Sequence, residues 1–382
     1  MVIPSYTTTK TIIAVMKQYF YITLLFFCAL LTFPTGANGQ GCVAVRNMSG
    51  CSLSYDSVSS ADKFLVSLNY RYFRSYKHFR GDHEEKERVE NGTEVINNDN
   101  SVILGINYFV NRKFSVGISV PFLIIDRSSM YEHYGNSPQA NPGRNRFHTQ
   151  SQGLGDIRIS AAYTIMPTHT SRLTLGAGLK LPTGNYDYKD HFHKRAKDGS
   201  DSVIYQVVDQ SMQPGDGGLG IIAEGNFVQN FGLSWLLYAD GMYMLNPRNT
   251  NGIQRSRLNT MVPNANEFSV ADQFFARFGA RYASGKMQYG LGGRVEGIPA
   301  RDLVGKSDGF RRPGYIISVE PSILFSTGQH VIGVNVPVAL YRNRIRSVLD
   351  VQRSAELGSR QHGDAAFADW LLSVSYAYRI QR

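Results

Sequence analysis

The stretch from Gly153 to Gly184 consists of two runs in which apolar residues alternate with polar or small ones. A period of two is that of a β-strand, and only Pro-Thr-His-Thr-Ser separates the runs, so the stretch predicts a hairpin with one apolar and one polar face. The apolar positions are Ile157, Ile159, Ala161, Tyr163 and Ile165 in the first run, and Leu173, Leu175, Ala177, Leu179 and Leu181 in the second.

The length of these runs favours a membrane over a soluble sheet. Each run has about ten residues, whereas soluble strands usually have about five or six, and about ten residues at a tilt of about 45° cross a bilayer. No segment beyond the first 40 residues approaches the roughly 18 consecutive apolar residues of a membrane-spanning helix. Because only helices and closed barrels satisfy their backbone groups in lipid, a chain of this kind must cross as a closed β-barrel.

The same alternation recurs along the chain and predicts about twelve strands, joined by connections that are alternately long and short. Besides the hairpin, the predicted strands cover residues 63–76, 100–110, 114–125, 217–228, 232–245, 268–283, 287–298, 314–326, 331–341 and 366–380. We therefore expect an all-β, transmembrane, antiparallel up-and-down β-barrel of about 12 strands, of the outer-membrane type. Its short turns and both ends of the mature chain should lie in the periplasm.

The N-terminal region is predicted to be removed on export. Lys17 precedes an apolar core from Tyr19 to Phe33, and small residues follow it, so residues 1–40 are expected to be a signal peptide, with a retained anchor helix as the alternative. Residues 41–62 would form a short periplasmic segment, and residues 63–382 the barrel. Cys42 and Cys51 open the mature chain, and an oxidising compartment favours a disulfide between them. Lipid attachment at Cys42 is the rival interpretation.

The formal net charge of +10 raises the question of nucleic acid. The Lys and Arg residues are scattered through predicted strands and loops, without a basic helix or an aromatic-basic stripe, so no nucleic-acid partner is expected. The expected partners are outer-membrane lipid, a small-molecule solute and, during biogenesis, the barrel-assembly machinery, for which the alternating C-terminal strand would serve as a signal.

Several short motifs resemble one family of barrels. GLGD at residues 153–156, LKLPTG at 179–184 and GDGGLG at 215–220 are similar to the outer-membrane barrels named for the MetA-type protein of phenol-degradation pathways. The resemblance implies a channel for small, often hydrophobic or aromatic compounds, distantly related to fatty acid channels. Two other functions stay open: a structural or adhesive barrel that uses its long loops, and an outer-membrane hydrolase.

Residues that alternate with the apolar ones are expected to line the lumen, and they carry both signs of charge. Such charges either form a constriction that selects solutes or pair with one another and stabilise a closed interior. Arg277 and Arg281 share a strand face, and Arg294 should point the same way, so this hairpin is predicted to favour anions. The selectivity candidates are Arg158, Lys180, Glu224, Asp240, Arg277, Arg281, Arg294, Glu296 and Glu320.

No catalytic, metal or cofactor site is predicted. A hydrolase needs a Ser and a His placed together on strands, but the histidines fall almost wholly in loops and turns. Asp190, His191 and His193 have ligand chemistry, yet they lie in a region, residues 185–214, that is expected to be a polar loop without fixed geometry. The predicted function is thus passive transport of small solutes across the bacterial outer membrane, not catalysis.

Overall fold

A computed structural model describes residues 62–165, 170–256 and 265–381. The predicted signal peptide and both Cys42 and Cys51 lie outside these ranges, so the export signal and the disulfide stay predictions. Within these ranges, no helix is long and apolar enough to cross a membrane.

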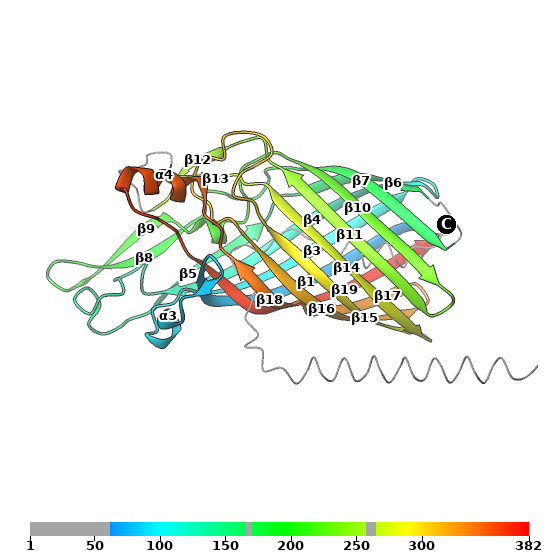
Figure 1. Cartoon of the computed structure of the whole chain (residues 1–382), viewed down its shortest axis with the longest axis horizontal. Coiled ribbons are helices and arrows are strands. Elements are labelled where there is room, and N and C mark those ends of the chain that lie inside the picture. Colours follow the sequence, from blue (N-terminus) through cyan, green and yellow to red (C-terminus); the bar gives the residue numbers. More distant parts are fainter. Residues whose placement is uncertain (1–61, 166–169, 257–264, 382) are drawn as a thin grey trace, which may run out of the picture. The chain divides into compact units, whose positions relative to one another are not determined.

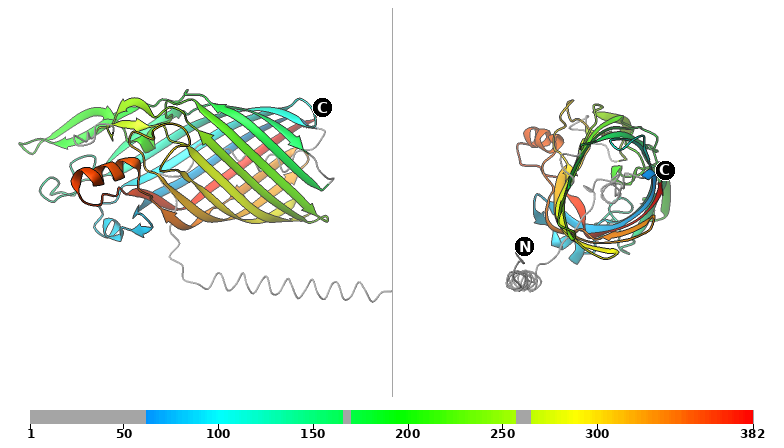
Figure 2. Two further views of the ribbon diagram at one scale, coloured as in Figure 1. Left: turned by 45° about the horizontal axis from the view of Figure 1, so that its top comes forward. Right: turned by 90° about the vertical axis from the view of Figure 1, so that its right-hand side faces the viewer.

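The described chain forms a closed antiparallel barrel of 12 staves, as the sequence predicts (Figure 1). The staves follow one another around the barrel in chain order, and β19 pairs with β1 to close it, with Val374 opposite Tyr70. Figure 2 shows the closed ring in its end-on view. The strands of the wall are β1 (Asp62–Arg80), β3 (Ile96–Phe109), β4 (Phe114–Ser129), β5 (Phe147–Leu154), β6 (Arg158–Ile165), β7 (Ser171–Lys180), β10 (Gly220–Phe231), β11 (Trp235–Leu245), β14 (Gln273–Ser284), β15 (Met287–Ile298), β16 (Gly314–Thr327), β17 (His330–Asn335), β18 (Val338–Asn343) and β19 (Ala365–Gln381).

Two staves consist of two strands each, where the sequence predicts one continuous strand at residues 331–341 and, before the hairpin, a loop up to about residue 152. β6 pairs with the first half of β4 and β5 with the second half, so one stave breaks between Leu154 and Arg158. β17 and β18 form another stave between β16 and β19, and they are separated at Pro337, which has no N–H for the ladder. Both breaks lie where a proline or a run of glycines stands in the sequence.

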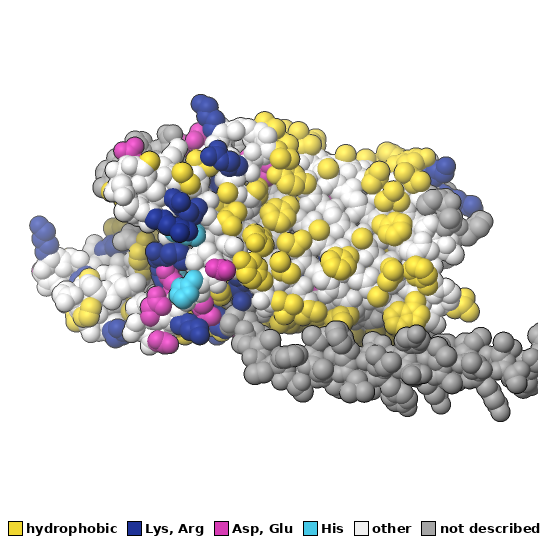
Figure 3. All heavy atoms as spheres, in the orientation of Figure 1, with side chains coloured by type: hydrophobic (Ala, Val, Ile, Leu, Met, Phe, Trp, Pro, Cys, Tyr) yellow, Lys and Arg dark blue, Asp and Glu magenta, His cyan; other side chains and the backbone are white. Residues whose placement is uncertain are grey.

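The outer face of the wall is apolar and the inner face is polar. Leu68, Leu104 and Ile323 are 47%, 41% and 47% exposed, although they are large hydrophobic residues in mid-strand. Their neighbours Ser67 and Asn69 are buried inside the barrel. Figure 3 shows hydrophobic side chains spread over the strands, whereas charged side chains gather at the end that carries the long loops. Such a belt is the surface that lipid covers.

The long connections lie at one end of the barrel, and the described short turns and the C-terminal end of β19 lie at the other (Figure 1). The long connections contain regular structure that the sequence analysis did not predict. In particular, the expectation that residues 185–214 have no fixed geometry is wrong, because β8 (Lys189–Arg195) and β9 (Asp201–Val207) pair in a hairpin around an Asp-Gly-Ser turn. The other elements are β2 (His83–Glu84), α3 (Lys86–Glu90), η1 (Gln210–Met212), β12 (Thr250–Gln254), β13 (Glu267–Ser269) and α4 (Val348–Leu357).

Candidate functional site: charged clusters in the lumen and at its mouth

A row of inward-facing polar residues crosses neighbouring staves at one level of the barrel. The register places Asp240 of β11 opposite both Asn226 of β10 and Arg277 of β14, and Arg277 opposite Arg294 of β15. Residues directly opposite each other in a sheet project to the same face, so these side chains meet in the lumen. The ladder thus brings together residues that lie far apart in the sequence.

Arg277 and Arg294 share the carboxylate of Glu320 on β16. Arg277 donates from Nη1 to Glu320 Oε1 at 2.9 Å, and Arg294 contacts Glu320 Oε2 through Nη1 at 3.3 Å. Asp240 accepts from Arg277 Nε at 2.7 Å, and Glu296 accepts from Arg294 Nη2 at 2.9 Å. The charges of these five residues therefore form one connected network, in which each guanidinium lies between two carboxylates.

Amides and aromatic rings complete this network. Asn335 Nδ2 donates to Glu320 Oε1 at 2.8 Å, and Asn226 donates to Asp240. Arg281, which is 1% exposed, lies over the ring of Tyr238 at 4.5 Å from its centroid. Tyr238 also lies 5.3 Å from the guanidinium carbon of Arg277, so one ring contacts two cations.

Strand glycines leave the space that these side chains occupy. A Cβ at Gly292 would lie 2.4 Å from the hydroxyl of Tyr238, and a Cβ at Gly176 would lie 2.7 Å from Cγ of Glu224. Neither distance is compatible with a side chain at that position. The glycines of β7 and β15 thus act by giving room to large inward residues of neighbouring staves.

A second cluster explains the glycine-rich motifs. Asp156 accepts from the backbone N–H of Gly184 at 3.0 Å and from that of Asp216 at 3.1 Å. Lys180 is 1% exposed and contacts both Asp156, at 3.9 Å, and Asp216. A Cβ on Gly215 would lie 2.5 Å from the carbonyl oxygen of Gly184, so only glycine allows this approach. The three motifs therefore converge on one buried Lys with two Asp partners.

The structure divides the predicted selectivity residues among different places. Asp240, Arg277, Arg294, Glu296 and Glu320 are joined in the first network. Lys180 belongs to the second cluster, with Arg158 opposite it on β6. Glu224 of β10 lies against Gly176 of β7. The sequence analysis left out Asn226, Asn335 and Tyr238, and the only signal for them was their place in the inward-facing alternation.

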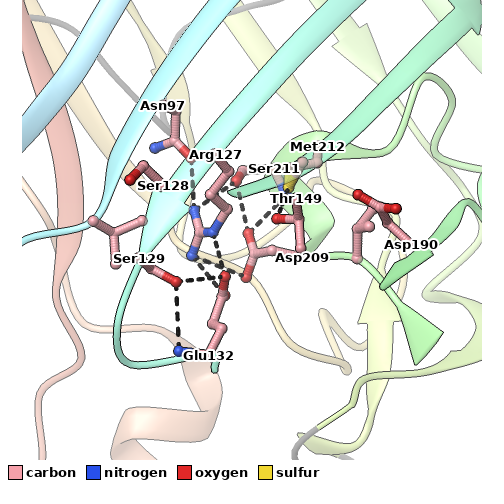
Figure 4. A network of polar contacts seen from close by, with 12 residues as sticks. Asn97, Arg127, Ser128, Ser129, Glu132, Thr149, Asp190, Asp209, Ser211 and Met212 are labelled. Carbon is pink, nitrogen blue, oxygen red and sulfur yellow. Dashed lines mark hydrogen bonds and ion pairs between the residues drawn. The ribbon is translucent and has the colours of Figure 1, made fainter. Parts of the chain in front are cut away.

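A further ionic network, which the sequence did not predict, lies at the long-loop end of the barrel (Figure 4). Arg127, near the end of β4, donates to both oxygens of Glu132 at 2.7 and 2.8 Å and to Asn97 at 2.7 Å. Arg312 holds Asp209 through two bonds of 2.8 and 2.7 Å. Burial opposes the ionisation of Asp209, but the charges of Arg312 and then of Arg127 outweigh it and hold the pKa of Asp209 well below its usual value.

Residues 86–339 match the model of a family described as "Putative MetA-pathway of phenol degradation". This match covers more than half of the 382-residue chain. The chain belongs to this family. The resemblance of its glycine-rich motifs to that family is confirmed.

Solved structures with a similar fold include an outer-membrane channel from Pseudomonas putida F1, with a TM-score of 0.56 and 11% sequence identity, over 88% of this chain and 100% of that chain. The P. putida toluene transporter TodX gives a TM-score of 0.45 and 10% identity, over 91% of this chain and 100% of that chain. At such identities the likeness concerns the fold alone. No curated protein matches the chain.

Proposed function

We propose that this protein is a bacterial outer-membrane channel for passive movement of small solutes, including hydrophobic or aromatic ones. The observation that carries the proposal is a closed barrel with an apolar outer face and a polar, charged inner face. An interior lined with ordered charges of both signs suits an aqueous path for solutes, and the alternative is that these charges only pair and stabilise a closed interior.

Export completes the proposal. The signal peptide at residues 1–40 would direct the chain to the periplasm, the barrel-assembly machinery would insert it, and Cys42 and Cys51 would then pair at the short-turn end. Mass spectrometry of the non-reduced N-terminal peptide tests the pairing, and two alkylatable thiols would contradict it.

The lumen network is proposed to act as a constriction. The cluster of Arg277, Arg294, Glu320 and their partners occupies one wall at one level, so solutes that pass this level meet an ordered polar surface that carries both signs of charge. Arg281, Lys180, Arg158 and Glu224 add further charged side chains to the barrel interior. Pairs of opposite charge favour neutral or amphipathic solutes more than a wall of one sign would.

The experiment is transport by the purified protein in liposomes. Swelling in a neutral sugar measures an aqueous path, and vesicles prepared without protein are the control. Liposomes that swell no faster than the control would contradict a channel and leave the loops as the functional part. Labelling of the folded protein by a serine-reactive probe would instead support a hydrolase.

A further inference from the structure

A cavity of about 240 Å³ lies at the long-loop end of the barrel. Its lining comes from the long-loop ends of β1, β4 and β19, from the segment before β16 and from helix α4. The lining side chains include seven arginines but only two carboxylates, those of Asp350 and Asp364. The composition of this surface is therefore strongly cationic.

Three of these arginines are held by acids that do not line the cavity. Arg311 binds Asp302 through two bonds of 2.7 and 2.6 Å. Arg312 and Arg127 are held in the same two-pronged way by Asp209 and Glu132. Such pairs fix the plane of a guanidinium. The acids that pair with these three arginines are not part of the cavity wall, so the wall itself carries more positive than negative groups.

The two acids of the lining are already occupied. Asp350 accepts from the backbone N–H of Ser347 at 2.8 Å and of Gly363 at 3.0 Å, and it pairs with Arg344 at 3.2 Å. Burial raises the pKa of Asp350, but Arg344 and these bonds outweigh it, so the pKa is lowered and the carboxylate is ionised. Asp364 is bonded to His78 at 2.6 Å and to Arg88 at 3.1 Å.

Cationic donors remain without acceptors in this lining. The Nε atoms of Arg311, Arg344 and Arg353 are buried and have no hydrogen-bond partner in the described chain. Arg311 and Arg344 are each only 2% exposed. The side chain of Arg353 of α4 makes no hydrogen bond or ion pair within the ranges 62–165, 170–256 and 265–381. These Nε atoms are closed off from the cavity, so an anion in the cavity would instead meet the Nη atoms of Arg353, whose side chain is only partly buried.

The rest of the lining is apolar or aromatic. Two guanidinium groups lie close to the ring of Phe310, with Arg255 at 3.9 Å and Arg312 at 4.7 Å from its centroid. Leu349 packs with Ala265 and Phe310 in one cluster that borders the cavity. Drug-sized ligands fill cavities of about 300–1,000 Å³, so this smaller cavity suits a molecule with a single ring.

We propose that this cavity is a binding site for a small carboxylate whose remaining part is apolar or aromatic, such as an arenecarboxylate. The carboxylate would accept from the guanidinium of Arg353, near the charges of Arg311 and Arg344, and the ring would lie against Phe310 and Leu349. This proposal rests on the proposed channel function, because it names the class of solute that is captured at the mouth.

Equilibrium dialysis of the folded protein in detergent at low salt tests the proposal, with benzoate as the probe. Benzoate should bind at least about tenfold more tightly than benzyl alcohol, which lacks the charge, and than inorganic phosphate, which lacks the ring. Arg353→Gln should weaken benzoate binding by about tenfold or more. The matched control is Arg360→Gln, since Arg360 is an exposed residue just beyond α4 that does not line the cavity, and it should bind like the wild type.

Equal binding of benzoate and benzyl alcohol, no binding of benzoate, or an equal loss in Arg360→Gln would overturn the site. The heat-dependent gel mobility of a folded barrel verifies that each variant is intact. Sugar-driven liposome swelling is measured on the same preparation, because it does not depend on benzoate. Swelling without benzoate binding refutes only the carboxylate site, whereas binding without swelling refutes only the channel.

Discussion

Neighbouring residues on one strand meet opposite environments in this barrel. Val334 of β17 is 37% exposed on the outer face, whereas Asn335 beside it is 4% exposed and donates to Glu320 in the lumen. Val334→Arg should cost about 2–4 kcal/mol if the position lies near the bilayer midplane. Val334→Leu is the control and should leave folding almost unchanged. Urea unfolding of both variants in lipid vesicles measures the difference, and equal stabilities would mean that this face does not meet lipid.

Glu320 is the residue on which the lumen network depends most. Glu320→Gln would remove the carboxylate that Arg277 and Arg294 share but leave each with its other acid, so the free energy of unfolding should fall by about 1.5–3 kcal/mol. Adding Arg294→Gln should increase the loss, because buried Glu296 then loses the guanidinium that donates to it. The control is Glu356→Gln, the same substitution at an exposed residue of α4, and it should alter the free energy of unfolding by no more than about 0.5 kcal/mol. A loss in Glu320→Gln as small as in that control would contradict the network.

The alternation of residues was enough to predict which side chains face the lumen, but it does not determine their partners. Arg277 and Glu320 are separated by 43 positions, and their contact depends on the exact register of β14, β15 and β16. The same limit applies to Asp156, Lys180 and Asp216, which meet only because three separate motifs pack closely. The local period of two therefore predicted which side chains face the lumen, but it could not predict which of them contact one another.

At the scale of elements, the β8–β9 hairpin depends on a buried neutral histidine. His133 is 4% exposed, stacks on Phe192, and accepts through Nδ1 from the backbone N–H of His193 at 3.1 Å. Burial lowers the pKa of His133 from its usual 6.5 to about 4. The undocked hairpin therefore binds a proton that the docked one excludes, so docking is most stable above about pH 6.5 and weakens as the pH falls toward 4.

Hydrogen exchange of the hairpin, expressed as protection factors between pH 7 and pH 4, measures this weakening. His133→Gln keeps an acceptor for His193 N–H but does not titrate, so the pH dependence of protection should largely disappear. His191→Gln is the control, because the side chain of His191 is 66% exposed on the same hairpin. Protection that declines equally in all three proteins would show that His133 is not responsible.

The elements of the long loops were predictable in part. Helix α4 begins with a capping box between Ser347 and Asp350 and ends at Gly358, which has a φ of 62°. Both features can be recognised in the sequence. The break at Pro337 could also have been predicted from the sequence, because proline has no N–H to donate to the hydrogen-bond ladder of a central strand. By contrast, the contacts that hold β8 and β9 depend on His133 of another loop and on Phe147 of β5, which no local pattern relates to them.

For the whole molecule, the alternation of long and short connections predicted both the strand number and the two unlike ends. That rule follows from the antiparallel pairing of a closed sheet, and it does not depend on side-chain detail. The cationic cavity at the mouth could not be predicted in the same way. Its arginines come from six separate segments, so only the folded loops bring residues such as Arg88, Arg127 and Arg353 together.

The balance of charge in the lumen makes a prediction about ion preference. Arg277 and Arg294 are paired with Asp240, Glu296 and Glu320, so replacing Arg277, Arg281 and Arg294 by Gln would leave carboxylates in excess on this wall. Planar-bilayer recording under a salt gradient should then show a lower anion-to-cation permeability ratio than in the wild type.

The control for that experiment removes one charge of each sign. Arg277→Gln combined with Asp240→Asn deletes an ion pair of 2.7 Å but leaves the net charge of the wall unchanged, so the permeability ratio should stay near that of the wild type. A change of equal size in the control would assign the effect to altered lumen shape. If the triple variant keeps the preference of the wild type, ions do not pass this level of the lumen, and the network is a brace between staves and not a constriction.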